Sequence, residues 1–139
     1  MLTGPLVILI LKIAVISVTL IFASSLVMLA RGRYLIHGRL NTVFFILTAA
    51  ALVGLEVVVR MIQPDIFDYL EGDQELKQRL TIHLCFSLPA TCFMPLMLFT
   101  GYSHRRRLHL CLAAVFSILW IGTFVTGVFF LPHSSVTTP

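Results

Sequence analysis

The chain contains few charged residues. Only 12% of its 139 residues are Asp, Glu, Lys or Arg, whereas 58% are hydrophobic. A soluble domain of this length leaves about a third of its surface in water and needs many more polar side chains to cover it. The composition therefore excludes an ordinary soluble domain and predicts an integral membrane protein in contact with the lipid bilayer.

Long polar interruptions are also rare. Four apolar stretches are each long enough to cross about 30 Å of hydrocarbon as a helix. They cover residues 5–30, 40–62, 80–101 and 109–131. None alternates apolar and polar residues as the strands of a transmembrane barrel do. The sequence predicts a single all-α domain, residues 1–139, built as a four-transmembrane-helix bundle.

The basic residues are concentrated in two short segments between the apolar stretches, which we call the basic hinges. The hinges are residues 31–40 and 102–109, and they hold six of the ten basic residues: Arg31, Arg33, Arg39, Arg105, Arg106 and Arg107. Short Arg-rich loops stay in the cytoplasm. We therefore expect a multi-pass protein of the cell inner (cytoplasmic) membrane with both hinges in the cytoplasm and both termini outside.

The acidic residues have the opposite distribution. Five of the six follow the second apolar stretch, on the predicted outer side: Asp65, Asp68, Glu71, Asp73 and Glu75. The net charge of +4 then reflects topology, and the sequence gives no reason to expect a nucleic-acid partner.

The sequence lacks a disulfide pattern and a recognisable catalytic set. Its three cysteines, Cys85, Cys92 and Cys111, all lie within apolar stretches, where a thiol usually acts as a small apolar side chain. No Ser-His-Asp or Cys-His arrangement can be assembled from the sequence. We therefore expect a protein that is not an enzyme.

Three charged residues lie within the predicted helices near the outer side. Glu56 and Arg60 are four residues apart with the acid first, the favourable order for an ion pair on one helix. Lys12 can extend its long side chain to the outer headgroups or approach Glu56. Glu56 and Arg60 thus form either a self-satisfied ion pair or, with Lys12 and His83, a polar outer-leaflet layer that lines a ligand or partner contact.

Histidines provide the sharpest functional indication. Each basic hinge delivers one, His37 or His109, to the start of a membrane helix, and His83 lies near the outer end of the third helix. Imidazole is a common ligand of haem iron and copper. Because His37 and His109 are expected at one depth, they are the candidate ligand pair. The alternative is that both are interfacial residues that contact headgroups or cap helices.

The residues around these histidines resemble those of the YozB-like membrane proteins, domain-of-unknown-function family 420. The resemblance covers about residues 31–131 and is carried by the first hinge, by Ile82-His83-Leu84, by Arg107-Leu108-His109 and by Val125-Thr126-Gly127-Val128. Members usually carry four intramembrane histidines. Three have counterparts here, and Val59-Arg60 stands where the fourth is usual.

The resemblance implies a small protein of the respiratory membrane that serves cytochrome oxidase assembly. Some members are linked to the maturation or activity of haem-copper oxidases, so haem b or copper is the implied cofactor. The competing hypothesis is a structural accessory subunit that packs against a larger membrane complex. A small transporter ranks last, because few polar residues lie between the two faces.

Overall fold

The computed structural model describes residues 3–68 and 72–131, which form four long helices. These are α1 (Gly4–Ala30), α2 (Tyr34–Val57), α4 (Gln74–Tyr102) and α5 (Arg106–Val125). With the short elements that extend α2 and α5, all four are long and apolar enough to cross a membrane. The prediction of an all-α bundle of four candidate transmembrane helices is confirmed.

Three short elements complete the described chain. Two π-helical turns, η1 (Val58–Ile62) and η3 (Thr126–Phe130), continue α2 and α5, and a 3-10 turn, η2 (Pro64–Phe67), follows η1. The acidic connection then leads to α4, with Glu71 outside the described residues.

Three helices begin several residues before the predicted apolar stretches: α2 at Tyr34, α4 at Gln74 and α5 at Arg106. The α4 helix starts at Gln74 because the Asp73 carboxylate caps it, accepting hydrogen bonds from the backbone N–H groups of Glu75 and Leu76. An ion pair between Glu75 and Arg79 stabilises the same first turns. The α2 helix likewise includes part of the first basic hinge, so helix and apolar stretch do not coincide.

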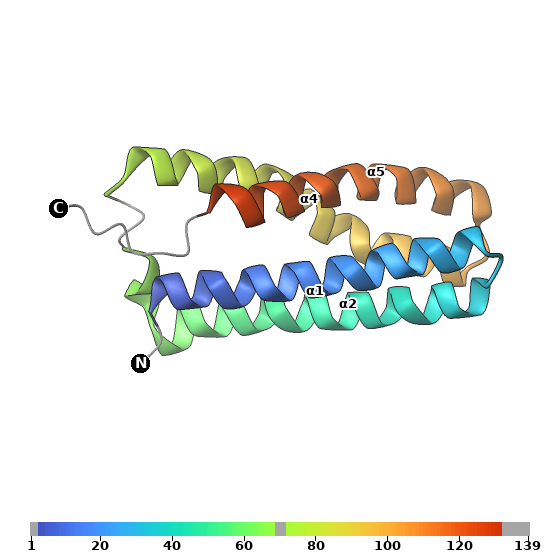
Figure 1. Cartoon of the computed structure of the whole chain (residues 1–139), viewed down its shortest axis with the longest axis horizontal. Coiled ribbons are helices and arrows are strands. Elements are labelled where there is room, and N and C mark those ends of the chain that lie inside the picture. Colours follow the sequence, from blue (N-terminus) through green and yellow to red (C-terminus); the bar gives the residue numbers. More distant parts are fainter. Residues whose placement is uncertain (1–2, 69–71, 132–139) are drawn as a thin grey trace.

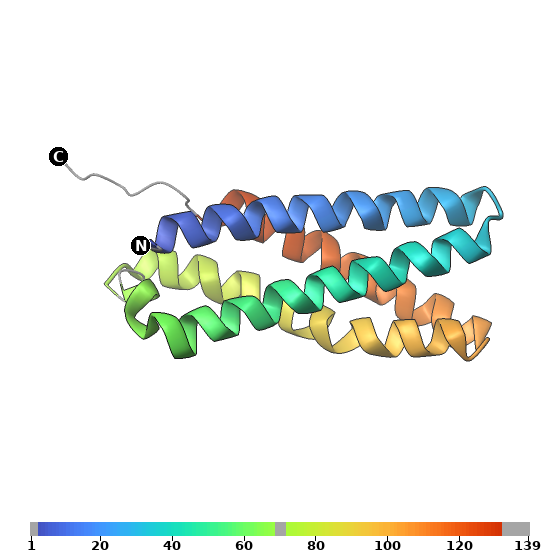
Figure 2. The same ribbon diagram turned by 90° about the horizontal axis from the view of Figure 1, so that it is seen from below.

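The helices are arranged as two antiparallel hairpins, α1 with α2 and α4 with α5. Each helix packs mainly against the other helix of its hairpin. Both hairpin turns lie at one end of the bundle, and the start of α1 and the end of η3 lie at the other (Figure 1). We call these the hinge end and the loop end. Figure 2 shows the same division from a perpendicular direction.

The two hairpin turns have the same backbone geometry. Gly32 and His104 adopt positive φ angles of 72° and 55°, and the residues after them, Arg33 and Arg105, have φ/ψ of −88°/66° and −82°/68°. The turn hydrogen bonds also correspond, including Arg33 N–H to Met28 O and Arg105 N–H to Thr100 O. The two turns therefore have the same conformation. The residue with positive φ is a glycine, Gly32, in the first turn and a histidine, His104, in the second.

The sequence after each turn is repeated too. His37, three residues into α2, and His109, three residues into α5, begin segments that match at six positions. The matched pairs are His37/His109, Leu40/Leu112, Val43/Val115, Phe44/Phe116, Ile46/Ile118 and Leu47/Leu119. Phe44 and Phe116 are both fully buried. The molecule is therefore a tandem of two related helical hairpins that run in the same direction.

Aromatic residues join the hairpins at mid-bundle. Phe22 and Phe44 from the first hairpin contact Phe116 from the second, with ring centroids 5.6 and 6.0 Å away. Trp120 packs on Phe44 at 4.8 Å, and its indole N–H donates to Thr19 Oγ1 on α1 at 3.1 Å. Edge-to-face ring pairs at these distances are favourable, so this cluster holds the two hairpins together.

Large apolar side chains cover the outside of the bundle. They include Leu20, Leu88, Ile118 and Phe129, each at least 60% exposed. Such a surface is stable in hydrocarbon and not in water. The exposed side chains and the helix lengths together fit a multi-pass protein in a lipid bilayer.

Candidate functional site

His37 lies in a closed hydrogen-bond network between α1 and α2. Its Nδ1 is 2.9 Å from the carbonyl oxygen of Ser25, an atom that can only accept, so Nδ1 carries the proton. The Ser25 hydroxyl donates to Asn41 Oδ1 at 2.7 Å, and the Asn41 amide donates to His37 Nε2 at 3.1 Å. Each ring nitrogen of His37 therefore has a protein partner.

Burial makes this network a structural contact between helices. Ser25 is fully buried and Asn41 is 7% exposed. The Ser25 hydroxyl also lies 2.8 Å from His37 Nδ1, but no substrate can reach it from outside the bundle. Ser25, His37 and Asn41 thus couple α1 to α2, as satisfied polar groups do inside membrane bundles.

His109 occupies the equivalent position in the second hairpin but has fewer partners. Its Nδ1 is 3.0 Å from the carbonyl oxygen of Met97 and 3.4 Å from Thr100 Oγ1. The carbonyl again places the proton on Nδ1 and leaves a lone pair on Nε2. The ring lies against Gly101, where an added Cβ would be 3.2 Å from its Cε1 atom. A side chain at position 101 would therefore require the imidazole to shift by a few tenths of an ångström.

The difference between the two histidines follows from the repeat. In each hairpin the imidazole Nδ1 donates to the carbonyl of the residue twelve positions earlier, Ser25 or Met97. The positions of Ser25 and Asn41 are taken in the second hairpin by Met97 and Ala113, whose side chains offer no hydrogen-bond donor. Among the residues that the structure describes, His109 Nε2 accordingly has no hydrogen-bond partner.

His109 Nε2 is also not fully buried. Every fully buried side-chain nitrogen and oxygen of the described residues has a hydrogen-bond partner. Because His109 Nε2 has none, it must have exposed surface, which agrees with the partial exposure of the residue. His109 is therefore an imidazole oriented through Nδ1, whose Nε2 lone pair has no hydrogen-bond partner in the described chain and is not fully enclosed.

His83 lies near the loop end and faces η3. Its Nδ1 is 2.9 Å from Thr126 Oγ1, whose own hydroxyl donates to Gly122 O at 2.7 Å, so the histidine donates. The ring lies against Gly127, where an added Cβ would be 3.0 Å from Cε1. His83 and His109 thus make reciprocal contacts, each resting on a glycine of the other helix of the hairpin.

The hydrogen bonds of the three histidines stay within their own hairpins. His37 bonds to α1, His109 to α4 and His83 to η3. Within residues 3–68 and 72–131, no three or more His, Cys, Asp or Glu side chains gather as a metal site would require. Joint ligation by His37 and His109 stays a prediction, and the contacts of His37 make it the less available partner.

The charged residues of the predicted outer layer lie near the loop end. Glu56 and Arg60 form the expected i,i+4 ion pair, with side chains 63% and 77% exposed on the flank of the bundle. A shallow hollow is lined by this pair together with Leu55 and Val59. Lys12 is half-buried on α1. A role for these residues in partner binding stays a prediction.

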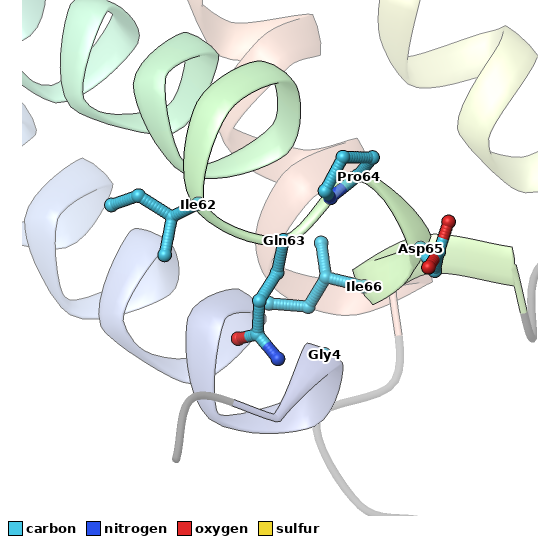
Figure 3. A pocket seen from close by; sticks show the side chains of 6 residues that line it. All are labelled: Gly4, Ile62, Gln63, Pro64, Asp65 and Ile66. Atoms are coloured by element: carbon cyan, nitrogen blue, oxygen red, sulfur yellow. The ribbon is translucent and has the colours of Figure 1, made fainter.

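The other hollow of note is also at the loop end. It is an open depression of about 300 Å³ beside the start of α1, lined by Gly4, Ile62, Gln63, Pro64, Asp65 and Ile66. Figure 3 shows the Gln63 side chain extending toward Gly4. Asp65 is the one charged residue in its lining, so the hollow offers no group of ligands or catalytic residues. The three cysteines are free and exposed on the bundle surface.

Comparison with protein-family models, with curated proteins and with solved structures finds no match for this chain. The resemblance to the YozB-like membrane proteins therefore stays a prediction that rests on the residues quoted for it.

Proposed function

We propose that this chain is a non-catalytic factor of the respiratory membrane that offers the His109 imidazole to haem iron or copper. In this role it would serve the maturation or activity of a haem-copper oxidase. The observation that carries the proposal is the hydrogen bond from His109 Nδ1 to Met97 O together with an Nε2 lone pair that has no hydrogen-bond partner among the described residues and is not fully buried. The respiratory setting rests on the resemblance alone.

The contact with Met97 suits His109 to bind metal. A histidine ligand usually donates its second ring N–H to a carbonyl, a carboxylate or water, which fixes the tautomer and makes the ligating nitrogen more basic. His109 has this arrangement, because its Nδ1 donates to Met97 O. Bound haem iron or copper would supply redox or ligand-exchange chemistry, and the chain itself would orient the imidazole.

A single imidazole does not complete a coordination sphere. Copper and haem iron both take additional ligands, and His37 Nε2 already accepts a hydrogen bond from Asn41. The remaining ligands would come from a partner protein or from the haem itself. This requirement fits a protein that acts on another membrane protein rather than as a self-contained metalloprotein.

The direct test is an absorption spectrum in the Soret and visible region together with metal analysis of the purified chain. Wild-type protein supplied with haem b or Cu(I) should retain one of them, and His109→Ala should lose it. His37→Ala is the matched control, because it removes the equivalent histidine of the first hairpin. We expect this control to keep the ligand, and His83→Ala measures any contribution from the loop end.

The second candidate function is that of a structural accessory subunit. The observation that favours it is the closed network of Ser25, His37 and Asn41, in which a membrane histidine serves helix packing alone. Protein that binds neither haem nor copper, and that co-purifies in fixed ratio with a larger complex in mild detergent, would contradict the ligand proposal and support this function.

A further inference from the structure

Six guanidinium groups are gathered at the hinge end of the bundle. Arg31 and Arg33 lie in and beside the first turn, Arg39 lies farther along α2, and Arg105, Arg106 and Arg107 follow the second turn. All six are exposed. Both turns lie at this end (Figure 1), so the six charges share one end of the bundle, and we call them together the basic surface.

This basic surface has no counter-ion in the described chain. The ion pairs of the described residues are Glu56 with Arg60 and Glu75 with Arg79, both near the loop end. The sequence has no acidic residue before position 56 or after position 75. None of the six arginines makes a side-chain hydrogen bond within the part of the chain that the structure describes. The described part of the chain therefore supplies no acidic partner for these six arginines, and a bound anion would come from outside it.

Two tyrosines place the surface at the level of lipid headgroups. Tyr34 at the start of α2 and Tyr102 at the end of α4 are 69% and 63% exposed next to the arginines. Exposed tyrosines at the ends of membrane helices lie in the headgroup layer. The guanidinium groups are thus expected beside phosphates, which arginine binds through paired N–H donors.

The two turns are also fixed relative to each other. Tyr102 Oη on α4 is 2.7 Å from Thr42 Oγ1 on α2, which links the hairpins near the hinge end. The repeated turn geometry places Arg33 and Arg105 at equivalent positions, each just before a helix. The basic surface therefore consists of two similar turns, and the contact between Tyr102 and Thr42 joins the two hairpins beside them.

We propose that this basic surface binds anionic phospholipids by their headgroup phosphates, in the leaflet that surrounds the hinge end. Arg33 and Arg105 are the central contacts, because each directly precedes a helix in the repeated turn and has no side-chain hydrogen bond among the described residues. A basic residue next to an anionic leaflet contributes about 1 kcal/mol. The six together would select phosphatidylglycerol over the zwitterionic phosphatidylcholine.

The test is native mass spectrometry of the full chain in detergent micelles with added phosphatidylglycerol or phosphatidylcholine. Wild-type protein should retain phosphatidylglycerol preferentially, and the double variant Arg33→Gln/Arg105→Gln should bind it about thirtyfold more weakly. Arg60→Gln/Arg79→Gln is the matched control, since it removes two positive charges at the loop end. Circular dichroism checks that both variants keep the helical fold.

Three outcomes would overturn the proposal. The first is equal retention of the two lipids by the wild-type protein. The second is an equal loss of phosphatidylglycerol in the hinge-end and loop-end double variants, because net charge alone would then explain the binding. The third is displacement of the lipid by excess inorganic phosphate, which would assign the surface to a soluble phosphate. None of these outcomes bears on the metal-binding proposal for His109.

Discussion

At the scale of single residues, the two hinge-end histidines show how one position can serve two roles. Both imidazoles donate through Nδ1 to a carbonyl of the preceding helix. His37 is then enclosed by Ser25 and Asn41, whereas His109 retains a free lone pair. The sequence predicted both histidines as candidates but missed Ser25 and Asn41, although Asn41, one turn after His37 in an otherwise apolar stretch, was an available signal.

The Ser25 network predicts a specific loss of stability. Ser25→Ala removes the hydroxyl that donates to Asn41 and leaves a buried amide oxygen without that partner, so the free energy of unfolding should fall by about 1 to 2 kcal/mol. Thermal unfolding in detergent measures the change. Ser24→Ala is the control, because that exposed hydroxyl bonds only to the carbonyl of Leu20 in its own helix. Equal stability of the two variants would contradict a structural role for the network.

At the scale of helices and turns, hydropathy located four helices but not their polar ends. The first turns of α4 precede the apolar stretch and form because of the Asp73 cap and the Glu75–Arg79 pair, which are local signals that a hydropathy scale ignores. The contacts between α4 and α5 were beyond sequence reasoning. They depend on how each helix is rotated about its axis, and composition does not determine that rotation.

Because α4 packs closely on α5, we expect substitution of Gly122 to destabilise the fold. A Cβ added at Gly122 would lie 2.6 Å from Cγ of Phe86, the atom that attaches the ring and cannot move without displacing the whole side chain. We expect Gly122→Ala to lower the free energy of unfolding by about 1 to 3 kcal/mol. The same substitution at Gly54, which has open space around it, should be neutral or stabilising by up to about 1 kcal/mol. The free energies of unfolding of both variants, measured in the same detergent, test this prediction. Equal values for the two variants would contradict it.

At the scale of the whole molecule, the two hairpins bury their side chains at equivalent positions. Val18, Phe22 and Phe44 of the first hairpin and Ala90, Met94 and Phe116 of the second are buried at equivalent positions. Comparison of the two halves of the sequence after each hinge would have revealed this repeat, because six residues match in register. The prediction that both basic hinges share one end agrees with the fold, whereas their assignment to the cytoplasm remains a prediction.

The repeat also gives the metal-binding proposal its internal control. His37 and His109 occupy equivalent positions, their helices run in the same direction, and both donate through Nδ1 to a carbonyl. A difference in ligand binding between them would therefore be due to the residues around Nε2. A ligand that selects His109 would show that the second hairpin binds it, while the histidine of the first hairpin serves helix packing.

The most direct measurement is the ¹⁵N NMR spectrum of histidine-labelled protein, with His37→Ala and His109→Ala used for assignment. In both imidazoles Nδ1 should carry a proton, and addition of haem b or Cu(I) should move the Nε2 resonance of His109 while that of His37 stays in place. A proton on His109 Nε2, or a response at His37 with none at His109, would contradict the account.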